Sequence, residues 1–102
     1  MSKVRNMDGN SGKVANQFII SEEGRGANGN FTLRETFQSY DSVIATITIW
    51  PDSEAVVVLD EDYWDYSVTV GKYRNQFLRE KKAVTKKKIE SGEYRLANLN
   101  KG

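Results

Sequence analysis

The clearest pattern of apolar and polar residues lies near the middle of the chain, at residues 43–50. The two types alternate there with a period of two, which predicts a β-strand with one buried face. The residues expected on that face are Val43, Ala45, Ile47 and Ile49, with Trp50 pointing outwards. A second apolar run, Ala55–Leu59, follows a Pro-Asp-Ser-Glu turn, so the two strands are expected to form an antiparallel hairpin.

Three shorter segments also have strand patterns, namely Gln17–Glu22, Phe31–Phe37 and Tyr94–Leu99. Residues 24–30 contain three glycines and two asparagines, which favours a mobile hairpin connection. This stretch lacks a Gly-Lys-Ser/Thr ending and is only weak evidence for a phosphate site. Residues 1–14 are interpreted as a flexible N-terminal tail and residues 100–102 as a C-terminal tail, which leaves one domain over residues 15–99.

A helical period appears in the second half of the chain. The apolar residues that recur at helical spacing are Val70, Tyr73 and Phe77. Either Asp65 or Ser67 is expected to cap the start of this helix. Thr85 is a candidate cap for a second helix, Lys86–Ser91, which Gly92 would end in the left-handed conformation. One long helix over residues 67–91 is the alternative.

The order of these elements predicts an α+β fold. We expect a small antiparallel sheet of about four or five strands, with one or two helices packed on one face. A chain of 102 residues, 38% of them apolar, supports a single domain with a modest core.

The amino-acid composition limits the kinds of catalytic and metal site that the chain can form. The chain has no cysteine and no histidine, which excludes disulfides, thiolate or imidazole metal sites and every Ser-His or Cys-His nucleophile. A carboxylate pair or a lysine could still take part in catalysis. We nevertheless expect a protein that is not an enzyme and uses no cofactor or metal. No apolar run reaches 18 residues, and the N-terminal segment lacks the apolar centre of a secretory signal. The expected location is the bacterial cytoplasm.

Charge is distributed unevenly along the chain, although the net charge is only +1. Residues 17–66 contain ten acidic and two basic side chains, whereas residues 72–95 contain nine basic and three acidic ones. This asymmetry suggests either a charged partner or two halves that pack against each other.

The basic residues give the first candidate site. It consists of Lys72, Arg79, Lys81, Lys82, Lys86, Lys87 and Lys88. If Thr85 is a cap, residues 86–88 fill a first helical turn, where each positive charge costs roughly 0.3–1 kcal/mol. Such a violation favours a patch for a phosphate backbone or an acidic protein. The structural alternative is a solvated helix end.

An acidic and aromatic set gives the second candidate site. It consists of Trp50, Asp60, Glu61, Asp62 and Tyr63. Its carboxylates could imitate DNA phosphates or bind a cation, but their spacing does not fit an EF-hand loop. The alternative is a structural role, in which this segment separates a strand from a helix and Trp64 packs in the core. The wider aromatic set Tyr40, Trp50, Tyr63, Trp64, Tyr66 and Tyr73 indicates core packing or a protein-binding patch.

Two segments resemble a known family. They are FQSYDSVIA at residues 37–45 and WDYSVTVGKYRNQFL at residues 64–78. They are similar to a family of small proteins from phages and prophages of Gram-positive bacteria, of unknown function. Its pattern is roughly F-x-S-Y-[ND]-[ST]-x-I-A, then W-x-Y-S-x-T-T-x-K-[YH] and F-L. Val70 stands where a second threonine is usual. The resemblance covers about residues 17–98 and implies a phage origin without identifying an activity.

These observations favour a non-catalytic phage protein that binds a host or phage macromolecule in stoichiometric amounts. Its specific form is an inhibitor of a defence system, such as a CRISPR nuclease. The alternative is a nucleic-acid-binding protein that uses the basic helical region. A metal-dependent hydrolase built on the carboxylates of residues 60–62 is a third hypothesis. Because edge strands invite pairing, a homodimer is also considered.

Overall fold

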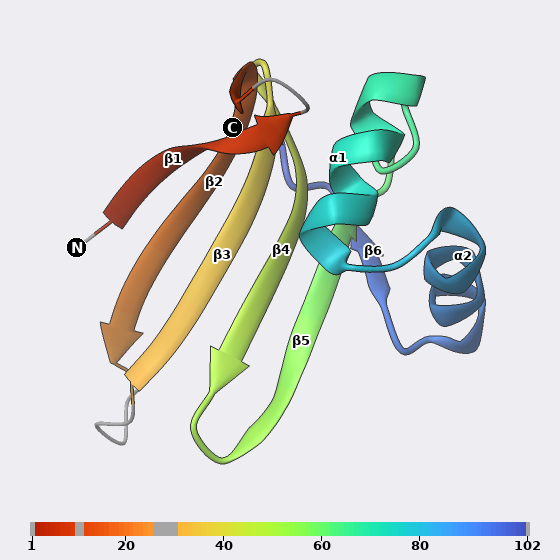
Figure 1. Ribbon diagram of the computed structural model, residues 1–102. Coiled ribbons are helices and arrows are strands. Elements are labelled where there is room, and N and C mark those ends of the chain that lie inside the picture. Colours follow the sequence, from red (N-terminus) through yellow and green to blue (C-terminus); the bar gives the residue numbers. More distant parts are fainter. Residues whose placement is uncertain (1, 10–11, 26–30, 102) are drawn as a thin grey trace.

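A single curled sheet organises the molecule, and the computed structural model describes residues 2–9, 12–25 and 31–101 of it (Figure 1). The strands are β1 (Ser2–Gly9), β2 (Gly12–Arg25), β3 (Phe31–Ser39), β4 (Ser42–Trp50), β5 (Ser53–Asp60) and β6 (Arg95–Ala97). The helices are α1 (Val68–Leu78) and α2 (Lys82–Ser91), both between β5 and β6. No helix among these residues is long and apolar enough to cross a membrane.

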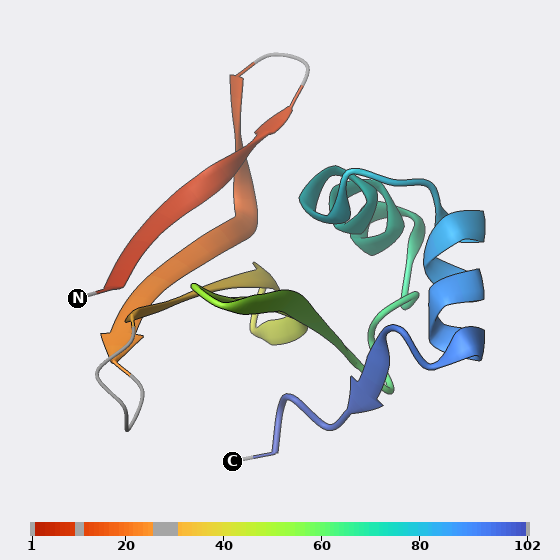
Figure 2. The ribbon, with the colours of Figure 1, turned by 90° about the horizontal axis from the view of Figure 1, so that it is seen from below.

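The strands follow one another across the sheet in chain order, from β1 to β6. Strands β1 to β4 each pair antiparallel with the next strand, and β6 adds to β5 in parallel after the two helices. Both helices cover the same face, and the β1–β2 hairpin rises beside α1 (Figure 2). The α+β class is confirmed, but the described sheet has six strands rather than four or five.

The N-terminal residues belong to the sheet. Strand β1 pairs with β2 from Ser2 opposite Glu22 to Gly9 opposite Gly12. The side chain of Met7 is buried in the core. The expected flexible tail over residues 1–14 is therefore wrong for residues 2–9 and 12–14. Strand β1 was missed because it is a polar edge strand that buries one large apolar side chain, so its sequence shows no clear alternation.

Gln17–Glu22 is a strand as predicted, but β2 is longer and extends through Gly24 and Arg25. The rest of the predicted mobile connection, residues 26–30, lies outside the described residues. The expected β4–β5 hairpin is confirmed.

A β-bulge changes which residues of β4 are buried. Phe37 pairs with Ala45 but Gln38 pairs with Val43, so Ile44 is the extra residue on β4. Both Ile44 and Ala45 are buried as a result. The predicted strict alternation is therefore wrong at this end of the strand, because it placed Ile44 on the outer face.

Helix α1 is capped by Ser67, one of the two expected caps, whose Oγ accepts a hydrogen bond from the Val70 N–H at 3.1 Å. Val70 and Tyr73 are buried against the sheet. The helix ends at Arg79, which has a left-handed backbone with φ of 58°. The alternative of one long helix is therefore wrong.

Helix α2 begins four residues earlier than predicted, and Thr85 does not cap it. Thr85 is buried inside the helix and donates a hydrogen bond to Glu80 Oε2 at 2.6 Å. Residues 86–88 consequently lie beyond the first turn, so they do not oppose the helix dipole as expected. Gly92 ends the helix with a φ of 85°, as predicted.

The last residues are attached to the sheet rather than free. The Asn100 side chain accepts from the Val43 N–H at 2.7 Å and donates to the Val43 carbonyl at 2.9 Å. It thus bonds both backbone groups of Val43, as a neighbouring strand would. The expected C-terminal tail is therefore wrong at Asn100.

Candidate binding site

Two segments that are distant in the sequence meet at one end of the molecule. They are the turn between β3 and β4 and the link between β5 and α1, residues 61–67 (Figure 1). Between them lies a pocket of about 300 Å³, which we call the tyrosine pocket. Its lining residues are Ser39, Tyr40, Ser42, Ile44, Tyr63, Tyr66, Ser67, Thr69 and Val70. All except Tyr63 come from the two sequence segments at residues 37–45 and 64–78.

The rim of the pocket carries a strained tyrosine. Tyr40 has a φ of 53°, a left-handed conformation that costs a side-chain-bearing residue roughly 1–2 kcal/mol. Its N–H donates to the Asn16 carbonyl at 2.7 Å, and its carbonyl accepts from Gln38 Nε2 at 2.8 Å. The side chain nevertheless remains 60% exposed. A strained backbone that presents an exposed ring is a feature that often accompanies function.

The other wall of the pocket is supplied by the link between β5 and α1, which Asp60 holds in place. Its buried carboxylate accepts hydrogen bonds from the N–H groups of Asp62 at 3.1 Å, Tyr63 at 2.9 Å and Leu99 at 2.8 Å. Asp60 therefore shapes the chain and is not part of an exposed acidic patch. Tyr63 packs edge-to-face against Tyr66, with ring centroids 5.3 Å apart.

Arg74 fixes the middle of the link, and sequence reasoning missed it. Its side chain is only 1% exposed and lies against the Trp64 ring. Nη1 donates to the Trp64 carbonyl at 2.7 Å and to Asp65 Oδ1 at 3.1 Å, and Nη2 donates to Asn75 Oδ1 at 3.0 Å. An arginine on a helix usually indicates a solvated face, so the local pattern contained no signal for this role.

Among the residues that the structure describes, no carboxylate, lysine or arginine lines the tyrosine pocket. Phenol, hydroxyl and aliphatic groups suit an uncharged apolar or aromatic group that also makes hydrogen bonds. This lining is therefore suited to binding such a group.

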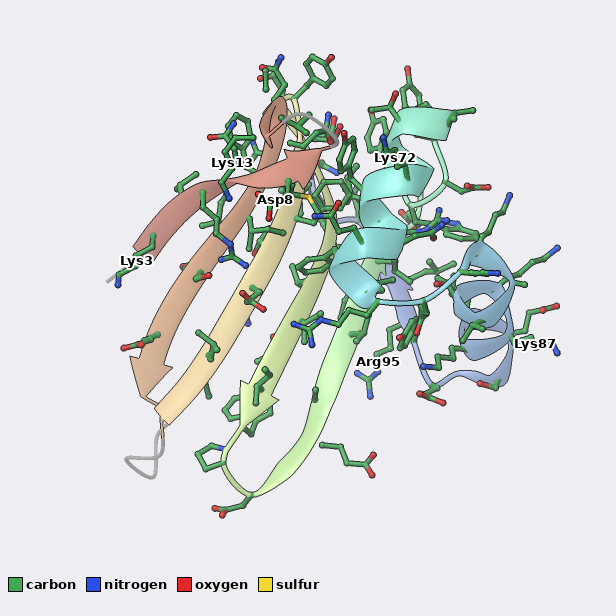
Figure 3. All side chains as sticks on the ribbon, in the orientation of Figure 1. Lys3, Asp8, Lys13, Lys72, Lys87 and Arg95 are labelled. Atoms are coloured by element: carbon green, nitrogen blue, oxygen red, sulfur yellow. The ribbon has the colours of Figure 1, made fainter. Side chains whose placement is uncertain are left out.

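The predicted basic cluster does not form one free patch. Lys82 Nζ pairs with Asp65 Oδ2 at 2.6 Å, and Lys88 Nζ pairs with Glu80 Oε1 at 3.0 Å. The remaining members, Lys72, Arg79, Lys81, Lys86 and Lys87, make no ion pair within the part of the chain that the structure describes. Lys72 lies on α1, whereas Lys87 is on α2 and points away from the sheet (Figure 3).

The predicted acidic and aromatic set is divided. Trp50 precedes β5 and Asp60 ends it, so the two lie at opposite ends of that strand. Glu61 and Asp62 are exposed beside Tyr63. Over residues 2–9, 12–25 and 31–101, no group of three or more acidic side chains is placed to hold a metal ion.

Two carboxylates have altered pKa values. Burial acts to raise the pKa of Glu80, but hydrogen bonds from Thr85, Lys88 and Tyr94 lower it overall. Burial likewise opposes the effect of Lys82 and Arg74, whose hydrogen bonds lower the pKa of Asp65. These groups attach α2 and the link to the rest of the fold. Their pKa shifts therefore mark structural clusters outside the tyrosine pocket.

The structure is thus that of a small α+β protein with a tyrosine-lined pocket. A family model described as "Family of unknown function (DUF8033)" matches residues 2–93, and the chain belongs to that family. The match includes β1, both walls of the pocket and both helices. No curated protein and no solved structure matches the chain.

Proposed function

We propose that this protein is a non-catalytic binding protein that docks on a macromolecular partner through the tyrosine pocket. The pocket would receive an apolar or aromatic side chain of a partner protein. Its volume of about 300 Å³ is at the lower end of ligand pockets and suits one side chain better than a cofactor.

The observation that carries the proposal is the position of Tyr40. The fold retains a tyrosine in a left-handed turn where asparagine or glycine would cost less, and the ring is left mostly in water. Tyrosine is also enriched among the residues that dominate protein interfaces, since it offers a large area at a low entropic cost.

In its specific form, the proposal makes the protein a phage-encoded inhibitor of a bacterial defence complex, such as a CRISPR nuclease, in the host cytoplasm. This form rests on the resemblance of residues 37–45 and 64–78 to phage proteins and on the absence of histidine and cysteine nucleophiles. A stoichiometric inhibitor needs a docking surface and no catalytic group.

The test is a pull-down from nuclease-treated host lysate with the tagged full chain, followed by size-exclusion chromatography with the purified partner. Tyr40→Asn keeps a residue that tolerates the left-handed backbone and removes the ring. We expect one partner that binds the wild type at a fixed ratio and is lost with Tyr40→Asn. Lys87→Gln, on the far side of α2, is the control and should retain it. A partner that binds Tyr40→Asn as well as the wild type contradicts the proposal.

A second candidate, nucleic-acid binding, is favoured by Lys86 and Lys87, which are exposed and make no ion pair among the described residues. It predicts affinity for a fluorescent DNA duplex that falls steeply as salt rises, and that falls further in Lys86→Ala/Lys87→Ala. Binding that does not depend on salt, or that survives the double substitution, contradicts this candidate.

A further inference from the structure

A second hollow adjoins the tyrosine pocket across the first turn of α1. It is more open, with a volume of about 670 Å³, and we call it the cationic hollow. Its lining residues are Asp65, Ser67, Val68, Gly71, Lys72, Arg74, Asn75 and Lys82. Ser67 lines both hollows. The two are thus parts of one continuous surface, divided by the short ridge of residues 66–68.

The ridge between the hollows exposes apolar groups. Val68 is 92% exposed and Tyr66 is 68% exposed, which leaves both side chains largely in water at the start of the helix. Neither is needed to fill the core, whose α1 members include Val70 and Tyr73. Exposed apolar side chains that stand between two hollows are typical of a docking surface.

The charge of the hollow is positive. Three basic side chains line it against one acid, Asp65, which already pairs with Arg74 and Lys82. Lys72 has no carboxylate partner among the described residues, and its Nζ lies 5.4 Å from the centre of the Tyr73 ring. The N-terminal end of α1 also faces this region, and the positive end of a helix dipole favours an anion.

The structure also keeps space open in the hollow. Gly71 lies inside α1, where glycine is unfavourable by roughly 1 kcal/mol relative to alanine. A Cβ at this position would be 3.7 Å from Arg74 Nη2 and 4.0 Å from Asp65 Oδ1, which are ordinary contact distances. Packing inside the protein therefore does not require glycine here. An added methyl group would instead occupy part of the wall of the hollow.

We infer that the partner contact has two parts, with an apolar or aromatic side chain in the tyrosine pocket and a carboxylate of the same acidic protein segment in the cationic hollow. This inference rests on the proposed function and adds the charge of the partner. We favour an acidic protein over nucleic acid because Lys72 is the one lysine in the lining of the hollow without a carboxylate partner among the described residues. A nucleic-acid backbone usually contacts several unpaired basic side chains.

The experiment is selection of a phage-displayed random dodecapeptide library on the immobilised full chain. The most enriched peptide is then synthesised and titrated by fluorescence anisotropy. We expect it to carry an aspartate or glutamate near an apolar or aromatic residue. Exchange of that acid for its amide, or Lys72→Gln in the protein, should weaken binding roughly tenfold. The matched control, Lys87→Gln, removes the same charge from α2 and should change nothing.

Other results of the selection distinguish failure of this inference from failure of the proposed function. Peptides that require Tyr40 but show no preference for an acid overturn the inference and leave the proposed function standing. Peptides that bind Tyr40→Asn as well as the wild type, or a library without any enrichment, overturn both. Salt-dependent binding of single-stranded oligothymidylate that is lost in Lys72→Gln would assign the hollow to nucleic acid instead.

Gly71→Ala provides a test that misfolding cannot imitate. The substitution should raise the melting temperature, because it favours the helix, and at the same time weaken the selected peptide, because it narrows the hollow. A more stable variant with unchanged affinity would show that the peptide does not occupy the cationic hollow.

Discussion

Asp60 and Arg74 hold the link between β5 and α1 through hydrogen bonds to its backbone. Both are buried charged residues, and each satisfies groups that would otherwise face the interior without partners. Because the link carries Tyr63 and Tyr66, these two residues position the wall of the tyrosine pocket without lining it. Tyr40 supplies the opposite rim and has a strained backbone.

The strain at Tyr40 leads to a prediction about stability. In Tyr40→Asn, we expect the free energy of unfolding to be unchanged or to rise by up to about 1 kcal/mol, because asparagine tolerates the left-handed conformation. Urea unfolding measures this change, and Tyr40→Phe, which keeps both ring and strain, is the control. A loss of more than about 1 kcal/mol would mean that the ring contributes to packing.

Asp60→Asn should destabilise the protein by about 1–3 kcal/mol. Oδ2 accepts from the link and Oδ1 accepts from Leu99, whereas an asparagine offers one acceptor oxygen. One of the two connections must therefore be lost. Amide hydrogen exchange at Tyr63 and Leu99 identifies which one. Asp62→Asn, at an exposed position, is the control, and equal stability of the two variants would contradict this role for Asp60.

At the scale of elements, several features could be predicted from residues that are neighbours in the chain. The β4–β5 hairpin, the Ser67 cap and the Gly92 terminus are examples, since each follows from the preferences of adjacent residues. Thr85 was misjudged because its partner, Glu80, also binds Lys88 and Tyr94, a cluster that tertiary packing assembles. The tyrosine pocket could not be located for the same reason, although its tyrosines were noted.

The Glu80 cluster makes the attachment of α2 dependent on pH. The folded-state pKa of Glu80 lies below its ordinary value of 4.5, so its stabilising contribution is present above that value and is lost as pH falls through the folded-state pKa. Glu80→Gln should cost about 1–3 kcal/mol at pH 7, and the difference from wild type should shrink below about pH 4. Urea unfolding at both pH values measures it, with the exposed Glu90→Gln as control. A difference that does not vary with pH would contradict this role.

At the scale of the whole molecule, the core joins the N-terminal hairpin to α1. One buried cluster contains Met7 from β1, Ile19 from β2 and Tyr73 from α1. A second cluster, which includes Leu59 and Tyr94, lies on the β5 side, and Phe77 packs against both. We therefore expect the hairpin to unfold in the same cooperative unit as the helix that lines the pocket.

Met7→Ala tests this connection. Removal of a buried methionine side chain should lower the free energy of unfolding by about 2–5 kcal/mol. Val4→Ala, on the same strand but 64% exposed, should lower it by less than about 0.5 kcal/mol. Thermal and urea unfolding provide the comparison. Similar small losses in both variants would show that β1 does not belong to the cooperative fold.

The order of the strands has a consequence for how the protein is made. Strands β2 to β5 each pair with the strand synthesised just before them, so most of the sheet can assemble as the chain leaves the ribosome. Strand β6 joins β5 only after both helices have been made. We therefore expect the turn that carries Tyr40 to form before the tyrosine pocket, which is complete only when α1 docks against strands β1 to β5.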